Sequence, residues 1–119
     1  MNQREINTKM KEIKAALKEL GFKKSKDPLD DAYRYETGGH YCLHVRLMPY
    51  QNYCPVQIIL KADYHDTSYD DAMSTYTSFA PDELDRVIPA FTKSIKILEG
   101  LNKKFKQITN QIEAFERLK

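Results

Sequence analysis

Three residues that can bind a metal or take part in nucleophilic chemistry alternate along one short stretch: His40, Cys42 and His44. Imidazole nitrogen and thiolate sulfur are common zinc ligands, and a cysteine beside a histidine forms the reactive pair of many thiol enzymes. Alternate side chains of a β-strand lie on the same face, about 6.6–6.8 Å apart. The stretch is therefore either a site or one polar face of a strand, and its neighbours decide which.

The predicted neighbours argue against a site. Zinc in proteins normally has three or four protein ligands. In the hairpin predicted below, the residues opposite His40, Cys42 and His44 are Lys61, Ile59 and Gln57, respectively. None of these is a good ligand, a lysine repels a cation, and no helix N-terminus or oxyanion hole is evident beside the thiol. We expect a solvent-facing strand surface with no catalytic residue, metal or cofactor; a small metal-binding or thiol enzyme is an alternative.

Two segments with an apolar residue at every second position predict a β-hairpin. Their apolar sets are Tyr41, Leu43, Val45 and Leu47 in the first and Val56, Ile58, Leu60, Ala62 and Tyr64 in the second. A loop at residues 49–52 gives a register that pairs Leu47 with Cys54, Val45 with Val56, Leu43 with Ile58, and Tyr41 with Leu60. A slip of one residue would move the apolar set to the other face, so the match favours this alternation.

Two more strands are predicted, at residues 32–36 and 72–79, and residues 22–24 are candidates for a short additional strand. Gly38 and Gly39 join the 32–36 strand to the hairpin. A two-residue turn would place Tyr33 and Tyr35 on the histidine face, whereas a three-residue loop would bury them, and the sequence leaves both open. Residues 67–73 fit a strand or a helical turn.

Helices are predicted at both ends of the chain. Residues 3–20 carry one apolar stripe that ends at Gly21, a residue that favours the left-handed conformation of a helix end. Residues 82–118 carry a heptad pattern that narrows to a single seam after Leu101. We expect this tail and the N-terminal helix to pack together as an antiparallel arm. Alternatively, each seam pairs across the interface of a homodimer.

These elements predict an α+β fold with one domain spanning residues 1–119. An antiparallel sheet of three to four strands is flanked by an N-terminal helix and a long C-terminal helix. No apolar run approaches the roughly 18 residues of a membrane span, so no membrane partner is expected. The absence of an apolar signal sequence and of a disulfide framework predicts a cytoplasmic protein with both cysteines reduced.

Charge is distributed unevenly along the chain. Residues 1–26 hold 8 basic and 3 acidic side chains, residues 27–83 hold 3 and 10, and residues 84–119 hold 8 and 4. The net charge of +2 therefore conceals basic helices and an acidic middle segment. Such polarity suits a macromolecular partner of complementary charge, although lysine-rich helix surfaces are also common without one.

Together these features predict a non-enzymatic binding module that acts on another protein, such as a small inhibitor or adaptor of the kind carried by phages or mobile elements. The expected protein-binding residues are an acidic cluster: Asp63, Asp66, Asp70 and Asp71. The alternative is nucleic-acid binding by basic residues of the C-terminal helix: Lys93, Lys96, Lys103, Lys104, Lys106 and Arg117.

Overall fold

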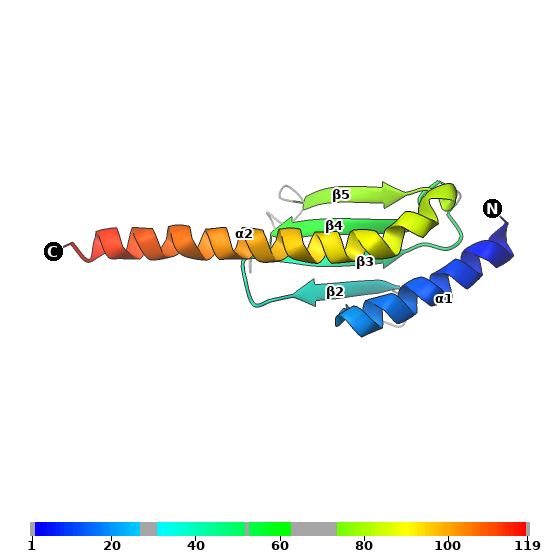
Figure 1. Ribbon diagram of the computed structural model, residues 1–119, viewed down its shortest axis with the longest axis horizontal. Coiled ribbons are helices and arrows are strands. Elements are labelled where there is room, and N and C mark those ends of the chain that lie inside the picture. The colour runs from blue at the N-terminus through cyan, green and yellow to red at the C-terminus, as the bar shows by residue number, and fades with distance from the viewer. Residues whose placement is uncertain (1, 27–30, 52, 63–73, 119) are drawn as a thin grey trace.

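Two helices pack on one face of an antiparallel sheet in the computed structural model, which describes residues 2–26, 31–51, 53–62 and 74–118 (Figure 1). In chain order the elements are α1 (Gln3–Leu20), β1 (Lys23–Lys24), β2 (Ala32–Glu36), β3 (Tyr41–Leu47), β4 (Val56–Ala62), β5 (Ser74–Phe79), a 3₁₀ helix (Pro81–Arg86) and α2 (Val87–Glu116). Each strand pairs with the next, giving the order β1-β2-β3-β4-β5. The predicted α+β fold is confirmed, and the sheet has five strands where three to four were predicted, because the two-residue β1 also joins it.

α1 begins and ends at the residues that its sequence indicates. The Asn2 side chain accepts a hydrogen bond from the Glu5 amide, which satisfies one of the unpaired N–H groups of the first turn. Gly21 has φ 97°, and the Phe22 amide then donates to the Leu17 carbonyl at 2.9 Å. This left-handed ending turns the chain directly into β1, so α1 lies back along the sheet.

The alternation predicted for β3 is confirmed, but the predicted register is wrong by two residues. Leu43, Val45 and Leu47 are all buried in the core. β3 pairs with β4 so that Leu47 lies opposite Val56 and Val45 opposite Ile58. The loop is longer than predicted, and the Met48 amide donates to the Pro55 carbonyl at 2.7 Å within it. A shift of two residues keeps the apolar side chains on their face, so periodicity alone does not distinguish the two registers.

The β2–β3 connection buries the tyrosines that the sequence left undecided. Tyr33 lies opposite Val45 and Tyr35 opposite Leu43, which places both on the core face. Tyr33 is buried, and Tyr35 packs partly buried against the same core. Residues 67–73, the other undecided segment, lie outside the described residues.

α2 starts later than predicted. Residues 81–86 form a 3₁₀ helix, in which the Glu83 carboxylate accepts a hydrogen bond from the Ala80 amide at 3.0 Å. Pro89 is the third residue of α2. Its missing N–H falls in the first turn, where no helical partner is available, so α2 continues through it for 30 residues.

The predicted helical arm is present, but α2 forms it alone and not together with α1. α1 places Ile6, Met10, Ile13 and Leu17 in the core shared with the sheet, so its apolar stripe is already covered. α2 covers the sheet with Val87, Phe91 and Leu98 and then projects beyond it as a lone helix (Figure 1). The molecule is therefore elongated, with extents of 66 × 27 × 22 Å. We call residues 102–118 the arm.

Candidate protein-binding site on the C-terminal helix

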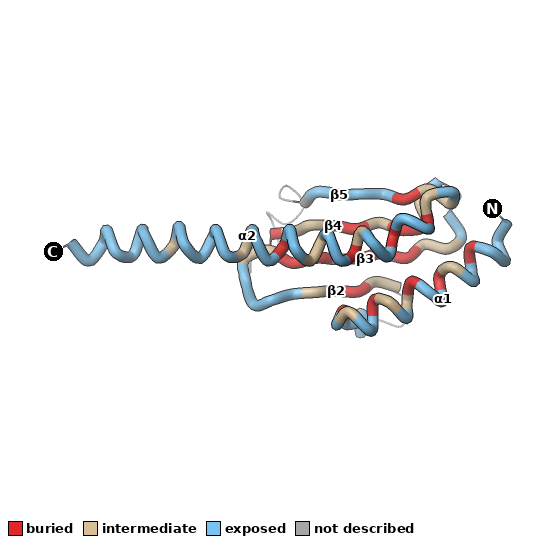
Figure 2. Tube along the Cα trace, viewed as in Figure 1, coloured by how far each residue is buried: buried red, intermediate tan, exposed pale blue. Residues whose placement is uncertain are grey.

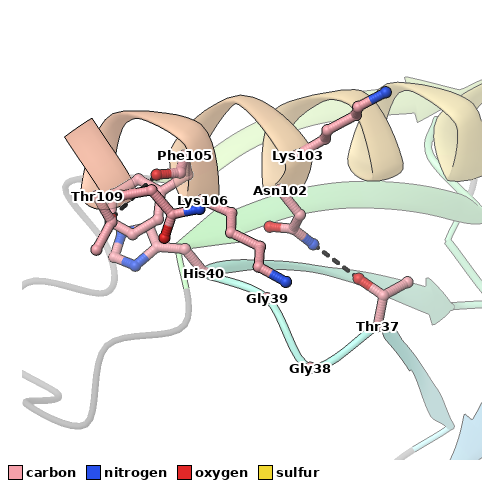
Figure 3. Close-up of a pocket in the computed structure, with 10 residues that line it drawn as sticks. Thr37, Gly38, Gly39, His40, Asn102, Lys103, Phe105, Lys106 and Thr109 are labelled. Carbon is pink, nitrogen blue, oxygen red and sulfur yellow. Dashed lines mark hydrogen bonds between the residues drawn. The ribbon is translucent and has the colours of Figure 1, made fainter. Parts of the chain in front are cut away.

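The arm leaves the sheet at a junction organised by Asn102 (Figure 3). The Asn102 Nδ2 group donates to the Thr37 hydroxyl at 2.9 Å and to the Tyr41 carbonyl at 3.1 Å. The Tyr41 amide donates to Asn102 Oδ1 at 2.8 Å. One amide side chain thus joins α2 to both ends of the β2–β3 hairpin loop, so the direction of the arm relative to the sheet is fixed.

Two glycines allow the hairpin loop to approach α2 this closely. Gly38 has φ 78°, a conformation that side chains with a Cβ rarely adopt. A Cβ on Gly39 would lie closer to Cγ of Asn102 than packing permits. Glycine is therefore required at residue 38 by the conformation of the turn and at residue 39 by the close approach of α2.

His40 belongs to this junction and is separated from the cysteine and histidine that follow it. Its ring stacks on Phe105 of α2, with centroids 4.0 Å apart and planes 12° apart. Cys42 and His44 lie on the opposite face of β3 from Leu43 and Val45. Cys42 is only 1% exposed, so the expected solvent-facing row of three side chains is wrong. In the register of the sheet this short thiol stands between Glu36 and Lys61.

The structure also bears on the alternative of a metal-binding or thiol site at this row. Among the residues that the structure describes, no three His, Cys, Asp or Glu side chains are close enough to share a metal ion. The thiol of Cys42 is buried, and therefore is not accessible to a substrate of any size. No disulfide bond joins Cys42 and Cys54.

The arm exposes the seam that the heptad pattern predicts. The seam consists of residues spaced alternately three and four apart along α2: Leu98, Leu101, Phe105, Ile108, Ile112 and Phe115. Leu98 is buried against the sheet, but the exposed fractions of Phe105, Ile108, Ile112 and Phe115 are 40%, 55%, 54% and 72%. Figure 2 shows this change from buried to exposed where α2 passes the end of the sheet. Large apolar side chains exposed at heptad spacing are typical of a helix that packs against another helix.

The exposed apolar surface continues from the arm toward the sheet. Ile97, which is 59% exposed, lines a groove of about 170 Å³ between α2 and strands β3 to β5. The other apolar residues of this groove are Leu43, Ile58 and Leu60. On the helical wheel, Ile97 lies about 20° from Ile108, so both are on the same side of α2. A helix bound along the arm would therefore reach this groove with one end.

Exposed lysines lie along α2 and at the base of the arm. In the described part of the chain, the lysines of α1 include ion-paired ones, such as Lys9 with Asp85 at 2.6 Å and Lys14 with Asp31 at 3.1 Å. By contrast, no ion pair within that part involves the α2 lysines: Lys93, Lys96, Lys103, Lys104 and Lys106. All five are exposed. Their charge is thus available to a partner.

Two of these lysines line a cavity of about 770 Å³ at the junction (Figure 3). Its walls combine the hairpin loop (Thr37 to His40) with Asn102, Lys103, Phe105, Lys106, Thr109 and Asn110 of α2. No acidic residue is among these described lining residues. Figure 3 shows Lys106 extending toward the hairpin loop and Lys103 pointing away from it. The cavity is suited to an anionic group.

The predicted site residues divide into two groups. The basic set, from Lys93 to Arg117, is exposed along α2 and its end, and the structure brings Lys103 and Lys106 together with the hairpin loop. The acidic cluster Asp63, Asp66, Asp70 and Asp71 lies outside the described residues. Sequence reasoning missed Asn102. The sequence gives little signal for it, because it is one polar residue beside an apolar seam and lies far along the chain from the Gly38-Gly39 pair.

Comparisons with known proteins do not assign the chain to a family. The sequence matches no protein-family model, no curated protein and no solved structure. Within the described residues, neither helix has an apolar stretch long enough to cross a bilayer.

Proposed function

We propose that this protein is a non-enzymatic binding module, an adaptor or inhibitor, that holds a helix of a partner protein along the seam of its arm. The observation that supports this most directly is the exposure of Ile108, Ile112 and Phe115 on a helix that projects from the sheet. Leaving such side chains in water is unfavourable by about 25 cal/mol for each Å² that a partner helix would bury. We place this activity in the cytoplasm, where both thiols stay reduced.

The junction strengthens the proposal because it makes the arm a directed surface. Asn102 and the stacked His40 and Phe105 hold the base of the arm against the hairpin loop. A partner therefore meets a seam whose orientation is set before binding, which lowers the ordering cost of association.

The proposal is tested by capture from the source cells with three proteins: the unchanged chain, Ile112→Asp and Asn110→Asp. Both substitutions introduce the same carboxylate at exposed positions of the same helix, but only Ile112 belongs to the seam. We expect mass spectrometry to find a partner that Asn110→Asp retains and Ile112→Asp loses at least tenfold. Equal recovery with both variants would contradict a role for the seam.

Nucleic-acid binding is a second candidate, favoured by the exposed α2 lysines that lack ion pairs in the described part of the chain. Their contacts with phosphates would release counterions, so retention of DNA or RNA should fall steeply with salt. Reversing Lys103, Lys104 and Lys106 to Glu should abolish this retention. Retention that persists in the triple variant would exclude the arm as a nucleic-acid surface.

A further inference from the structure

We propose that the helix bound by the arm is the arm of a second copy of this chain, packed in antiparallel orientation. This inference rests on the proposed function, because it assigns an occupant to the same seam. The apolar stripe of α1 is covered by the sheet, so among the described helices only α2 has a seam available for this contact.

The seam is complementary to itself when two arms run in opposite directions. In heptad terms Phe105 and Ile112 occupy a positions, and Ile108 and Phe115 occupy d positions. Antiparallel packing places a positions opposite d positions. Phe105 then meets Phe115 of the second copy, and Ile108 meets its Ile112. A two-fold axis passes between the two seams at the level of residue 110, while the Asn110 side chain itself lies on the opposite side of α2, and this axis repeats each contact, as expected for an isologous dimer.

The charges beside the seam favour the antiparallel direction. One flank of the seam carries Asn102, Thr109 and Glu116, and the other carries Lys104 and Gln111. In antiparallel packing like flanks face each other, so Glu116 of the second copy lies near Asn102 and the adjacent Lys106. Lys106 lines the junction cavity, whose described lining contains no acidic residue. Parallel packing would instead direct Lys104 of the second copy toward this flank.

The end of the partner arm also finds an apolar surface. In the antiparallel register, Leu118 of the second copy lies level with Asn102. Leu118 is exposed in the single chain. Beside Asn102 on the seam side stand Leu101 and Ile97, which borders the groove with Leu43 and Leu60. Leu118 of one copy would therefore pack against the apolar surface at the base of the other copy's arm.

The contact area predicts a weak, concentration-dependent dimer. The exposed parts of the arm's apolar side chains amount to on the order of 500 Å² per chain, against about 800 Å² per partner in a standard interface. Interfaces of this size are typical of weak association, so we expect dissociation in about the micromolar range or weaker. The monomer mass is 13.9 kDa.

Sedimentation velocity from micromolar to millimolar concentration measures this association. We expect the mass to rise from one chain toward two in the unchanged protein and in Asn110→Asp, and to remain at one chain in Ile112→Asp. A monomer at every concentration would overturn the inference. If the capture experiment still depended on Ile112 in that case, the proposed function would stand with a different partner helix.

Crosslinking then tests the direction, in a Cys54→Ser background that leaves only the buried Cys42. Gln111→Cys and Lys104→Cys place a thiol on the same flank, one heptad apart. In the antiparallel dimer the thiols introduced at position 111 of the two copies are nearly level, whereas those at position 104 are separated by about 18 Å along the helix axis. A short bis-maleimide should therefore join two Gln111→Cys chains and leave Lys104→Cys chains uncrosslinked. Equal crosslinking of the two variants would contradict the antiparallel arrangement.

Discussion

Asn102 of α2 satisfies both main-chain polar groups of Tyr41, the first residue of β3, because it accepts from the amide at 2.8 Å and donates to the carbonyl at 3.1 Å. Tyr41 stands where the hairpin loop enters the sheet, and Asn102 stands where the helix leaves it. This contact makes the base of the arm part of the folded core, while the seam a turn later is exposed.

Replacing Asn102 with alanine should destabilise the fold. The Tyr41 amide and carbonyl would lose their partner, which costs about 1–3 kcal/mol of unfolding free energy. Asn110→Ala, at an exposed position two turns later, is the control and should change stability by less than about 0.5 kcal/mol. Urea unfolding followed by circular dichroism measures both. Equal stability of the two variants would show that the Asn102 contacts contribute nothing.

Two glycine-to-alanine substitutions should act in opposite directions. At Gly39 the added Cβ would collide with the side chain of Asn102, so that side chain, the hairpin loop or α2 must move. At Gly100, inside α2, no atom outside the helix backbone and its chain neighbours lies within 4 Å of the added Cβ. Alanine there should stabilise the helix by about 0.5–1 kcal/mol. Thermal unfolding should therefore give a lower midpoint for Gly39→Ala and a higher one for Gly100→Ala; a raised midpoint for Gly39→Ala would contradict the described junction.

The ion pair between Lys9 and Asp85 should be visible in a titration. The hydrogen bond from Lys9 and the negative charge of Asp85 raise the pKa of Lys9 above 10.5. Since the folded pKa is raised, this contribution to stability is present below pH 10.5 and is lost as the pH rises through the folded pKa. Asp85→Asn should lower the pKa of Lys9 in an NMR titration, with little change in stability because the pair is exposed. An unchanged Lys9 titration would contradict the contact.

Burial should make Tyr33 a second source of alkaline sensitivity. Desolvation, together with the charge of Asp31, raises the pKa of Tyr33 above 10. The unfolded tyrosine ionises first, so stability falls as the pH rises above 10 and toward the folded pKa. Tyr33→Phe should flatten this part of the stability profile, whereas Tyr76→Phe, at an exposed residue of β5, should not. Urea unfolding at a series of alkaline pH values measures the slope, and identical slopes for the two variants would place Tyr33 outside the core.

Local signals in the sequence were sufficient for individual elements. The stripe and the glycine at residue 21 located α1, and alternation identified the core face of β3. Alternation could not fix the β3–β4 register, because the residue opposite Val45 is apolar in both registers. It is Val56 in the predicted register and Ile58 in the observed one. Alternation predicts which face of the sheet a side chain lies on, but it does not predict how far that side chain is buried. The burial of Cys42 was therefore missed.

Contacts between distant elements were less accessible from the sequence. Both terminal helices carry a similar apolar seam, and periodicity does not say what covers it. The connection between α1 and β1 determines which seam is covered. Gly21 and Phe22 lead α1 directly into β1, so the seam of α1 packs on the sheet and the seam of α2 is left exposed. Asn102 and Gly39 lie far apart along the chain, and their relationship became evident only from the fold.

The most direct test of whether a second copy covers the seam is hydrogen exchange of the arm amides, measured at low and high protein concentration. A solvated helix end opens easily, whereas a seam covered by a second helix protects its amides. We predict that protection across residues 106–116 increases with concentration in the unchanged chain and in Asn110→Asp, and stays low in Ile112→Asp. Protection that is independent of concentration and equal in all three proteins would contradict the pairing of the seam with a second copy.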